Sequence, residues 1–223
     1  MRIKNKYRKR WFGYFDLLGF SEFVLNNHIS EVLDLYNEVL ATVNQNYPDD
    51  KRVVISKTWF SDTFVFYTFG CTAHEFVKIE MVARLFFQKL ILKGIPVRGA
   101  LTAGPVYTNR KMNIYIGTGL IDAYEYGECQ NWLGMVLTPS VYKQLENTLI
   151  PVQERAFYRP VPSLGIIRKK DPLHVFAFNF DNGKVNGRNP YIKQLEKMEK
   201  EAPETSKIKY RNTLDFIYQN SRK

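Results

Sequence analysis

Two aspartates occupy positions where the surrounding sequence does not favour an acidic residue. Asp16 ends the aromatic segment RWFGYFD, and Asp62 interrupts WFSDTFVFY, which is otherwise apolar and aromatic. Burying an unpaired carboxylate costs free energy, so each aspartate is expected either to occupy a turn or to face a cation. The structural interpretation is a strand-end or hairpin-turn residue, because aspartate is common in turns. The functional interpretation is a metal ligand.

The hydrophobic pattern predicts the elements that would position these two aspartates. A strand is expected over residues 10–15, followed by a helix from Ser21 to Val43 with apolar residues at helical spacing. Residues 53–57 and 63–69 are rich in β-forming side chains and predict a hairpin with Asp62 at its turn.

The middle of the chain predicts a further series of helices and strands. The expected elements are a helix over 75–93 that ends at Gly94, strands over 96–107 and 113–116, a helix over 120–129, a strand over 134–137 and a short helix that Thr138 and Pro139 open. The β-α-β-β-α-β order of this series is typical of an α+β, ferredoxin-like fold of the split βαβ type.

The C-terminal part predicts an extension of this core. Residues 157–180 predict an added hairpin around Lys169–Pro172, and residues 191–200 and 206–219 predict two charged, weakly amphipathic helices. We therefore expect one domain over residues 1–223. Its core would cover about residues 8–150, and residues 151–223 would form a C-terminal hairpin and helical extension.

In a ferredoxin-like sheet the first strand and the hairpin are neighbours, so Asp16 and Asp62 are expected to converge at one edge. Two carboxylates with backbone carbonyls form a hard oxygen site suited to Mg²⁺ or Mn²⁺ carrying a substrate phosphate. The chemistry that such a site indicates is two-metal phosphoryl transfer.

Composition narrows the classes of protein. The chain has 223 residues and two cysteines, and no apolar run is long enough for a transmembrane helix, so we expect a cytoplasmic protein without a membrane role. The formal net charge is +10, and six of the first ten residues are Lys or Arg. No nucleic-acid-binding motif accompanies this charge, so a solvated basic face or a phosphate-handling site is expected rather than a nucleic-acid partner.

Three segments resemble the class III nucleotide cyclases. FDLLGFSEF (residues 15–23) resembles their metal-binding segment, and WFSDTFVFY (residues 59–67) resembles their aspartate-bearing hairpin, with Ser61 in place of a glycine. VRGALTAGPVY (residues 97–107) resembles their R-x-G strand. The resemblance runs from about Phe12 to Tyr142, and its order agrees with the fold expected from periodicity.

Two departures separate the chain from the purine cyclases. Thr58 stands where these usually carry a base-selecting lysine, and LIDAYE (residues 120–125) places Ile121 and Glu125 where they carry a transition-state asparagine and arginine. RGALTAG followed by GTGLIDAYE resembles instead the compact bacterial pyrimidine cyclases of the Pycsar antiphage systems. That resemblance implies a homodimer that makes cyclic UMP from UTP, or cyclic CMP from CTP, for a separate cyclic-nucleotide-binding effector.

The resemblance also implies roles for individual residues. Asp16 and Asp62 would hold two Mg²⁺ or Mn²⁺ ions, and the carbonyl of Leu17 would add a ligand. Phe20 would contact the substrate where the following helix presents its backbone amides to the triphosphate. Arg98 would stabilise charge during attack on the α-phosphorus, because a guanidinium suits phosphate oxygens; the alternative is an ion pair with an acid such as Glu125.

Base recognition is expected in the first strand of the hairpin. Lys57, Thr58 and Trp59 would line the base, and bulky side chains there would exclude purines. Two other interpretations remain. The chain would be a catalytically degenerate cyclase domain that binds nucleotide or dimerises, or, on its charge alone, a basic nucleic-acid-binding protein.

Overall fold

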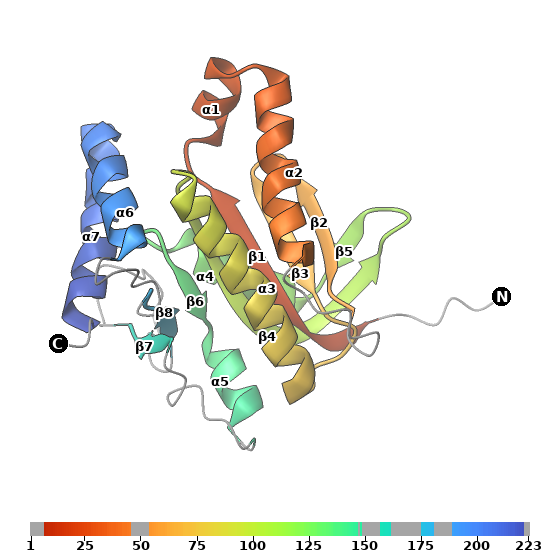
Figure 1. Ribbon diagram of the computed structural model, residues 1–223. Helices are drawn as coiled ribbons and strands as arrows, with labels where there is room; N and C mark the ends of the chain where they lie inside the picture. Colours follow the sequence, from red (N-terminus) through yellow and green to blue (C-terminus); the bar gives the residue numbers. More distant parts are fainter. Residues whose placement is uncertain are drawn as a thin grey trace.

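The part of the chain described by the computed structural model forms one eight-stranded β-sheet with helices packed on it (Figure 1). The described residues are 7–45, 54–146, 148, 157–161, 175–180 and 189–220. The strands are β1 (Arg8–Leu17), β2 (Ser56–Phe60), β3 (Thr63–Tyr67), β4 (Val97–Asn109), β5 (Ile114–Ile116), β6 (Met135–Leu137), β7 (Tyr158–Pro160) and β8 (Phe176–Phe178). The helices are α1 (Phe20–Asn26), α2 (Ile29–Gln45), α3 (Ala73–Leu92), α4 (Thr118–Glu128), α5 (Pro139–Leu145), α6 (Pro190–Glu201) and α7 (Glu204–Asn220).

The strand order confirms the predicted α+β, ferredoxin-like core. The sheet runs β2-β3-β1-β4-β6-β8-β7, and β5 pairs with β4 outside this path. The pairs β2–β3, β3–β1 and β1–β4 are all antiparallel, as in a split βαβ fold, whereas β4 and β6 are parallel. Strand β1 therefore lies between the hairpin and β4.

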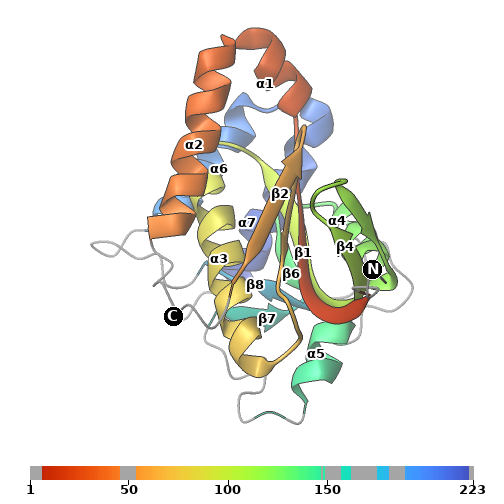
Figure 2. The ribbon, with the colours of Figure 1, turned by 90° about the vertical axis from the view of Figure 1, so that its right-hand side faces the viewer.

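The sheet has two faces, with α2 and α3 on one of them and α4 on the other (Figure 2). Trp11, Phe15 and Leu17 are buried in the core that contains the apolar face of α3. Phe12 and Tyr14 point the other way and pack in a cluster with Ala123 of α4. Successive side chains of a strand alternate between the faces, so Asp16 lies on the α4 face with Phe12 and Tyr14.

Helix α3 follows its sequence signals closely. Thr72 and Glu75 form a capping box at its start, and Gly94, with φ 77°, follows its end. Phe86, Phe87 and the other apolar residues on its inner face are fully or almost fully buried. The prediction of a helix over 75–93 is therefore confirmed within two residues at its N-terminal end.

The prediction of one helix over residues 21–43 is wrong, because the segment forms two helices. Asn27 has an extended backbone, and its side-chain amide donates to the carbonyl oxygen of Phe23 at 2.7 Å. The backbone N–H of His28 then donates to the Glu31 carboxylate at 2.9 Å, which stabilises the start of α2. Side chains that bond to the backbone in this way compete with a continuous helix.

The C-terminal hairpin extends the main sheet, whereas the sequence predicted an added unit. Strands β7 and β8 pair with each other, and β8 also pairs with β6. The predicted turn around Lys169–Pro172 lies outside the described residues. The two predicted terminal helices are present as α6 and α7.

The sequence suggested a solvated basic face near the N-terminus, but one of its positive charges is buried. Arg10 is buried, and its guanidinium donates to the carbonyl oxygens of Thr68, Phe69 and Val106. Burial lowers the pKa of Arg10. This residue therefore joins β1 to the segment after β3 and to β4. No helix in the described ranges is both long enough and apolar enough to cross a membrane.

A buried carboxylate joins the C-terminal strands to α3. Glu80 accepts hydrogen bonds from Arg84 Nε and from the Tyr158 hydroxyl, both at 2.9 Å. We expect Tyr158→Phe to lower the free energy of unfolding by about 1.5–3 kcal/mol, because it removes a hydrogen bond to a buried charge. Urea unfolding of the purified variant measures this loss.

Tyr218→Phe provides the matched control, because Tyr218 is exposed and its hydroxyl donates to Glu196 at 2.9 Å at the surface. We expect this variant to lose less than about 0.5 kcal/mol. Equal losses in the two variants would contradict the role given to the buried carboxylate.

Candidate active site

Asp16 and the hairpin turn meet at the C-terminal end of β1. In the sheet register Asp16 lies opposite Thr63 of β3 on one side and opposite Arg98 of β4 on the other. Asp62 lies in the turn between β2 and β3, and its carbonyl oxygen accepts a hydrogen bond from the Leu17 N–H at 3.0 Å. The structure thus brings the two aspartates to the same edge of the sheet.

Helix α2 holds the turn that carries Asp62. The Tyr36 hydroxyl donates to the carbonyl oxygen of Ser61 at 2.7 Å. Ser61 has φ 53°, in the left-handed region where glycine is usually found, so its backbone needs outside support. Burial and the neighbouring charge of Asp62 raise the pKa of Tyr36 to about 12, so the tyrosine stays a neutral donor at physiological pH.

Tyr36 also packs against the start of α1, where the chain turns from β1 into the helix. The ring of Phe20, the first residue of α1, packs against Tyr36 with ring centroids 5.9 Å apart. Gly19 precedes it with φ 70°, which allows the chain to turn from the strand into the helix. The Leu17 side chain is buried on the α3 side of the sheet, so only the backbone of this residue is available to a ligand on the Asp16 side.

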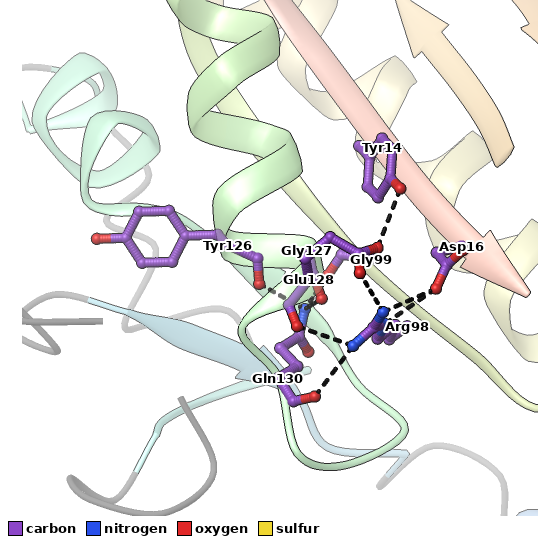
Figure 3. A network of polar contacts seen from close by, with 8 residues as sticks. All are labelled: Tyr14, Asp16, Arg98, Gly99, Tyr126, Gly127, Glu128 and Gln130. Carbon is purple, nitrogen blue, oxygen red and sulfur yellow. Dashed lines mark hydrogen bonds and ion pairs between the residues drawn. The ribbon is translucent and has the colours of Figure 1, made fainter. Parts of the chain in front are cut away.

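Arg98 joins Asp16 to the end of α4 (Figure 3). Its Nε and Nη2 both lie 3.0 Å from Asp16 Oδ2, and Nη2 forms a second ion pair with Glu128 Oε2. Its Nη1 donates to the carbonyl oxygens of Glu128 and Gln130 at 2.8 and 3.4 Å. Every nitrogen of the guanidinium therefore has a protein partner. The ion pair with an acid of α4 is made with Glu128 rather than with Glu125.

Glu128 is the site residue that sequence reasoning missed. Its Oε1 accepts a hydrogen bond from the Tyr14 hydroxyl at 3.0 Å. Helix α4 approaches β1 closely here, since a Cβ atom on Gly127 would lie 2.6 Å from the Tyr14 ring. The glycine before Glu128 was the available signal, because it permits a close approach of the helix to the sheet.

The balance of charge at this edge is negative. Burial first and the negative charge of Glu128 second raise the pKa of Asp16 to about 6, against the opposing effect of Arg98. Asp62 adds a smaller effect in the same direction. Asp16 and Glu128 thus share one guanidinium and Asp62 adds a third negative charge near Asp16, an arrangement that favours the binding of a cation.

The donor set fits a hard divalent cation that takes part of its coordination from other sources. No cluster of three or more His, Cys, Asp or Glu side chains suited to a metal exists within the described ranges. Asp16 and Asp62 would therefore be completed by backbone carbonyls, water and substrate phosphates, as is common for Mg²⁺.

The structure separates the three residues predicted to recognise the base. Thr58 pairs with Val65, which pairs with Tyr14, so Thr58 lies on the Asp16 face. Lys57 and Trp59 alternate with it and lie on the opposite face, where the Trp59 ring stacks on Phe64 with centroids 6.4 Å apart.

Lys57 and Phe60 lie on opposite faces of β2. Burial lowers the pKa of Lys57, on the face away from Asp16. Phe60 pairs with Thr63, which pairs with Asp16, so it lies on the Asp16 face, and its side chain is 85% exposed. The alternation of a strand predicts these faces once its pairing register is known.

Comparison with solved structures identifies the fold. No protein-family model and no curated protein matches the sequence. The guanylate cyclase domain of RhGC from Catenaria anguillulae in complex with GTP matches with a TM-score of 0.56 and 12% identity, over 77% of this chain and 96% of that one. The adenylyl cyclase CyaB from P. aeruginosa matches with a TM-score of 0.50 and 14% identity, over 77% and 94%.

A third structure, a non-canonical dimeric guanylyl cyclase domain of the RhoGC fusion protein from the aquatic fungus Blastocladiella emersonii, matches with a TM-score of 0.54 and 12% identity, over 77% and 96%. At these identities the likeness concerns the fold. The chain therefore has the fold of the catalytic domain of class III nucleotidyl cyclases.

Proposed function

We propose that the protein is a nucleotidyl cyclase whose substrate is a pyrimidine nucleoside triphosphate, UTP in the first place and CTP as the alternative. The observation that carries the proposal is the meeting of Asp16, Asp62 and Arg98 at one edge of a cyclase-like sheet. The sequence resemblance to the Pycsar cyclases supplies the choice of a pyrimidine.

The reaction is an internal phosphoryl transfer. The ribose 3′-oxygen forms a bond to the α-phosphorus, the bond from that phosphorus to the pyrophosphate oxygen breaks, and the hydroxyl proton is released. Two Mg²⁺ or Mn²⁺ ions would supply activation of the hydroxyl and neutralisation of the leaving pyrophosphate. Asp16, Asp62 and the carbonyl of Leu17 would hold them, and Phe20 would lie beside the triphosphate.

Arg98 is the candidate for charge stabilisation in the chain itself. Its guanidinium lies in direct contact with Asp16, so its positive charge is fixed next to the proposed metal site. A fixed charge close to the developing negative charge lowers the barrier without reorganisation at the moment of reaction.

For the base, the faces of β2 support Thr58 and not Lys57 or Trp59 as the direct contact. Thr58 shares the Asp16 face, and a short hydroxyl side chain replaces the lysine that purine cyclases usually carry. Phe60 lies on the same face and would add a bulky side chain beside Thr58.

The proposed active unit is a homodimer. Phe60, Ile121 and Tyr124 are all at least 50% exposed and lie on or beside the face that α4 covers. In the proposed homodimer these exposed apolar side chains would lie in the interface. In the proposed cytoplasmic pathway the cyclic nucleotide would act on a separate binding effector in antiphage defence.

A second candidate function is a catalytically degenerate domain that binds nucleotide or dimerises. It is favoured by α4, which presents Ile121 and Glu125, both exposed, where purine cyclases carry an asparagine and an arginine. Retention of two aspartates around a half-buried, negatively charged edge favours the enzyme.

An activity assay separates the two functions. The purified protein is incubated with Mn²⁺ and ATP, GTP, UTP or CTP separately, and the products are identified by mass spectrometry. We expect cyclic UMP and pyrophosphate from UTP. Cyclic CMP instead would change the substrate, a purine product would overturn the pyrimidine assignment, and no cyclic product from any of the triphosphates would overturn the enzyme.

Asp62→Ala is expected to abolish turnover and to leave the protein folded, because Asp62 lies in a turn outside the main hydrophobic core. Turnover and circular dichroism measure the two properties. Asp34→Ala is the matched control, since it removes an exposed aspartate of α2, and its activity should equal that of the wild type. Wild-type turnover in Asp62→Ala would contradict the metal assignment.

The raised pKa of Asp16 predicts that its ionised carboxylate, which would bind the metal, lowers the stability of the folded protein. Because its pKa in the folded protein, about 6, exceeds the usual value of 3.8, the folded protein loses stability as the pH rises through this interval. We therefore expect Asp16→Asn to raise the free energy of unfolding by about 1–3 kcal/mol at pH 7.5 without divalent ions.

Urea unfolding at pH 7.5 and near pH 4 measures this difference, which should shrink at the lower pH because the wild-type carboxylate is then protonated. Added Mn²⁺ should stabilise the wild type and not the variant. A variant less stable than the wild type at pH 7.5 would show that the Arg98 contact outweighs the cost of burying Asp16.

A further inference from the structure

We propose that Glu128 is a positioning residue for the metal site. It holds Arg98 against Asp16, and through Arg98 it fixes the orientation in which the Asp16 carboxylate meets a divalent cation. The proposal rests on the metal-dependent function proposed above and adds a residue on α4 to it.

Arg98 is constrained to one orientation by its partners. The guanidinium is a planar group whose donors have fixed directions. Its Nε and Nη2 engage Asp16 Oδ2, Nη2 also engages Glu128 Oε2, and Nη1 donates to the Glu128 carbonyl oxygen. Glu128 thus supplies a side-chain and a backbone partner, so the guanidinium cannot turn away from Asp16 without breaking contacts to Glu128.

Glu128 is itself held in place by Tyr14. The Tyr14 hydroxyl donates to its Oε1 at 3.0 Å, and the Glu128 side chain is 31% exposed. Tyr14 belongs to β1, two residues before Asp16. The series of side-chain contacts Tyr14–Glu128–Arg98–Asp16 therefore begins and ends on the same strand (Figure 3). The network therefore closes on itself through a rigid element.

The segment after α4 anchors the same network to β4. Gln130 is buried, and its Nε2 donates to the carbonyl oxygens of Gly99 and Tyr126 at 2.9 and 3.0 Å. The Trp132 indole N–H donates to Gln130 Oε1 at 2.7 Å. The carbonyl oxygens of Glu128 and Gln130 accept hydrogen bonds from Arg98 Nη1. The contacts of the Gln130 side chain hold these two oxygens at a fixed distance from β4, the strand that carries Arg98.

The Asp16 carboxylate is oriented by its contact with Arg98. Arg98 engages Oδ2 of Asp16 and not Oδ1, so the carboxylate would keep an oxygen to hold a cation. The positive charge of Arg98 is shared between Asp16 and Glu128, so it does not fully neutralise Asp16. The Asp16 carboxylate therefore keeps part of its negative charge, which would attract a cation. Mutation of an outer partner that orients a ligating side chain typically weakens metal affinity by about 10- to 100-fold. We expect an effect of this order for Glu128.

Mn²⁺ alone, without nucleotide, tests the inference. It is titrated into the protein, and the electron paramagnetic resonance signal of free Mn²⁺ reports the bound fraction. We expect Glu128→Gln to weaken binding about 10-fold or more, because the second anchor of Arg98 is lost. Glu125→Gln is the matched control: it removes the same charge from an exposed position of the same helix and should weaken binding less than about twofold.

Ionic strength separates a contact from a charge acting through space. The Debye length falls from about 10 Å at 0.1 M to about 3 Å at 1 M, so a through-space effect shrinks at high salt. We expect most of the Glu128→Gln effect to persist at 1 M salt. An effect that disappears there would overturn the positioning role.

A double-mutant cycle tests whether Glu128 acts through Arg98. In an Arg98→Lys background the fork that reaches both carboxylates is absent, so Glu128→Gln should change Mn²⁺ affinity less than about twofold. A purely structural role for Glu128 would give the same loss in both backgrounds, and this result would overturn the inference. Circular dichroism confirms that each variant is folded.

A milder variant covers the case in which Glu128→Gln does not fold. Tyr14→Phe removes one hydrogen bond to Glu128 without changing charge and should weaken Mn²⁺ binding about threefold. Wild-type affinity in both Glu128→Gln and Tyr14→Phe would overturn the inference and leave the proposed function intact. Wild-type protein that binds no Mn²⁺, or whose binding survives Asp62→Ala, would overturn the metal site itself and the inference with it.

Discussion

The contact between Asp16 and Arg98 depends on the place of β1 in the sheet, and the candidate site depends on that contact. Because β1 is paired on both sides, the register that puts Asp16 opposite Arg98 also puts it opposite Thr63, next to the turn that carries Asp62. A shift of one residue would move Asp16 to the α3 face, into the apolar core. The aromatic residues of β1 therefore fix the site as well as the fold.

The same register explains why a negatively charged edge is tolerated. The α3 face is filled by large apolar side chains, among them Phe15, Phe66 and Phe86, and their burial supplies stability that the edge does not. On the α4 face a single guanidinium serves Asp16 and Glu128. The raised pKa of Asp16 shows that this compensation is incomplete, a condition common at functional sites, where ligand binding removes the remaining cost.

Local patterns predicted the parts of the structure that depend on local physics. The helix over 75–93, the hairpin and the strand that ends at Asp16 follow from periodicity and capping signals within each segment. The break at Asn27 escaped prediction because a side-chain hydrogen bond to Phe23 outweighs a continuous apolar pattern. The convergence of Asp16 and the Asp62 turn was predicted because a ferredoxin-like topology fixes which strands are neighbours.

Glu128 and the faces of β2 depend on contacts between distant segments, and one sequence does not contain them. Glu128 reaches Arg98 only because α4 packs closely on β1 at Gly127. Lys57 and Trp59 were expected beside the base because they are adjacent to Thr58 in sequence, yet adjacent residues of a strand point to opposite faces. The register of the hairpin, rather than its composition, decides which of them is available.

In the proposed function the edge strand β2 would connect the choice of base with dimerisation. Solved structures with this fold include cyclases of guanylate and adenylyl type, so the sheet does not itself determine the base. Selectivity must come from side chains that differ around a common frame, and Thr58 and Phe60 lie on the Asp16 face at its outermost strand. Among the described residues β2 pairs with β3 alone and Phe60 is largely exposed, a combination that suits contact with a second chain. In the proposed dimer a partner that covers Phe60 would also lie beside Thr58 on the same face of β2, so dimerisation and base selection would depend on the same surface.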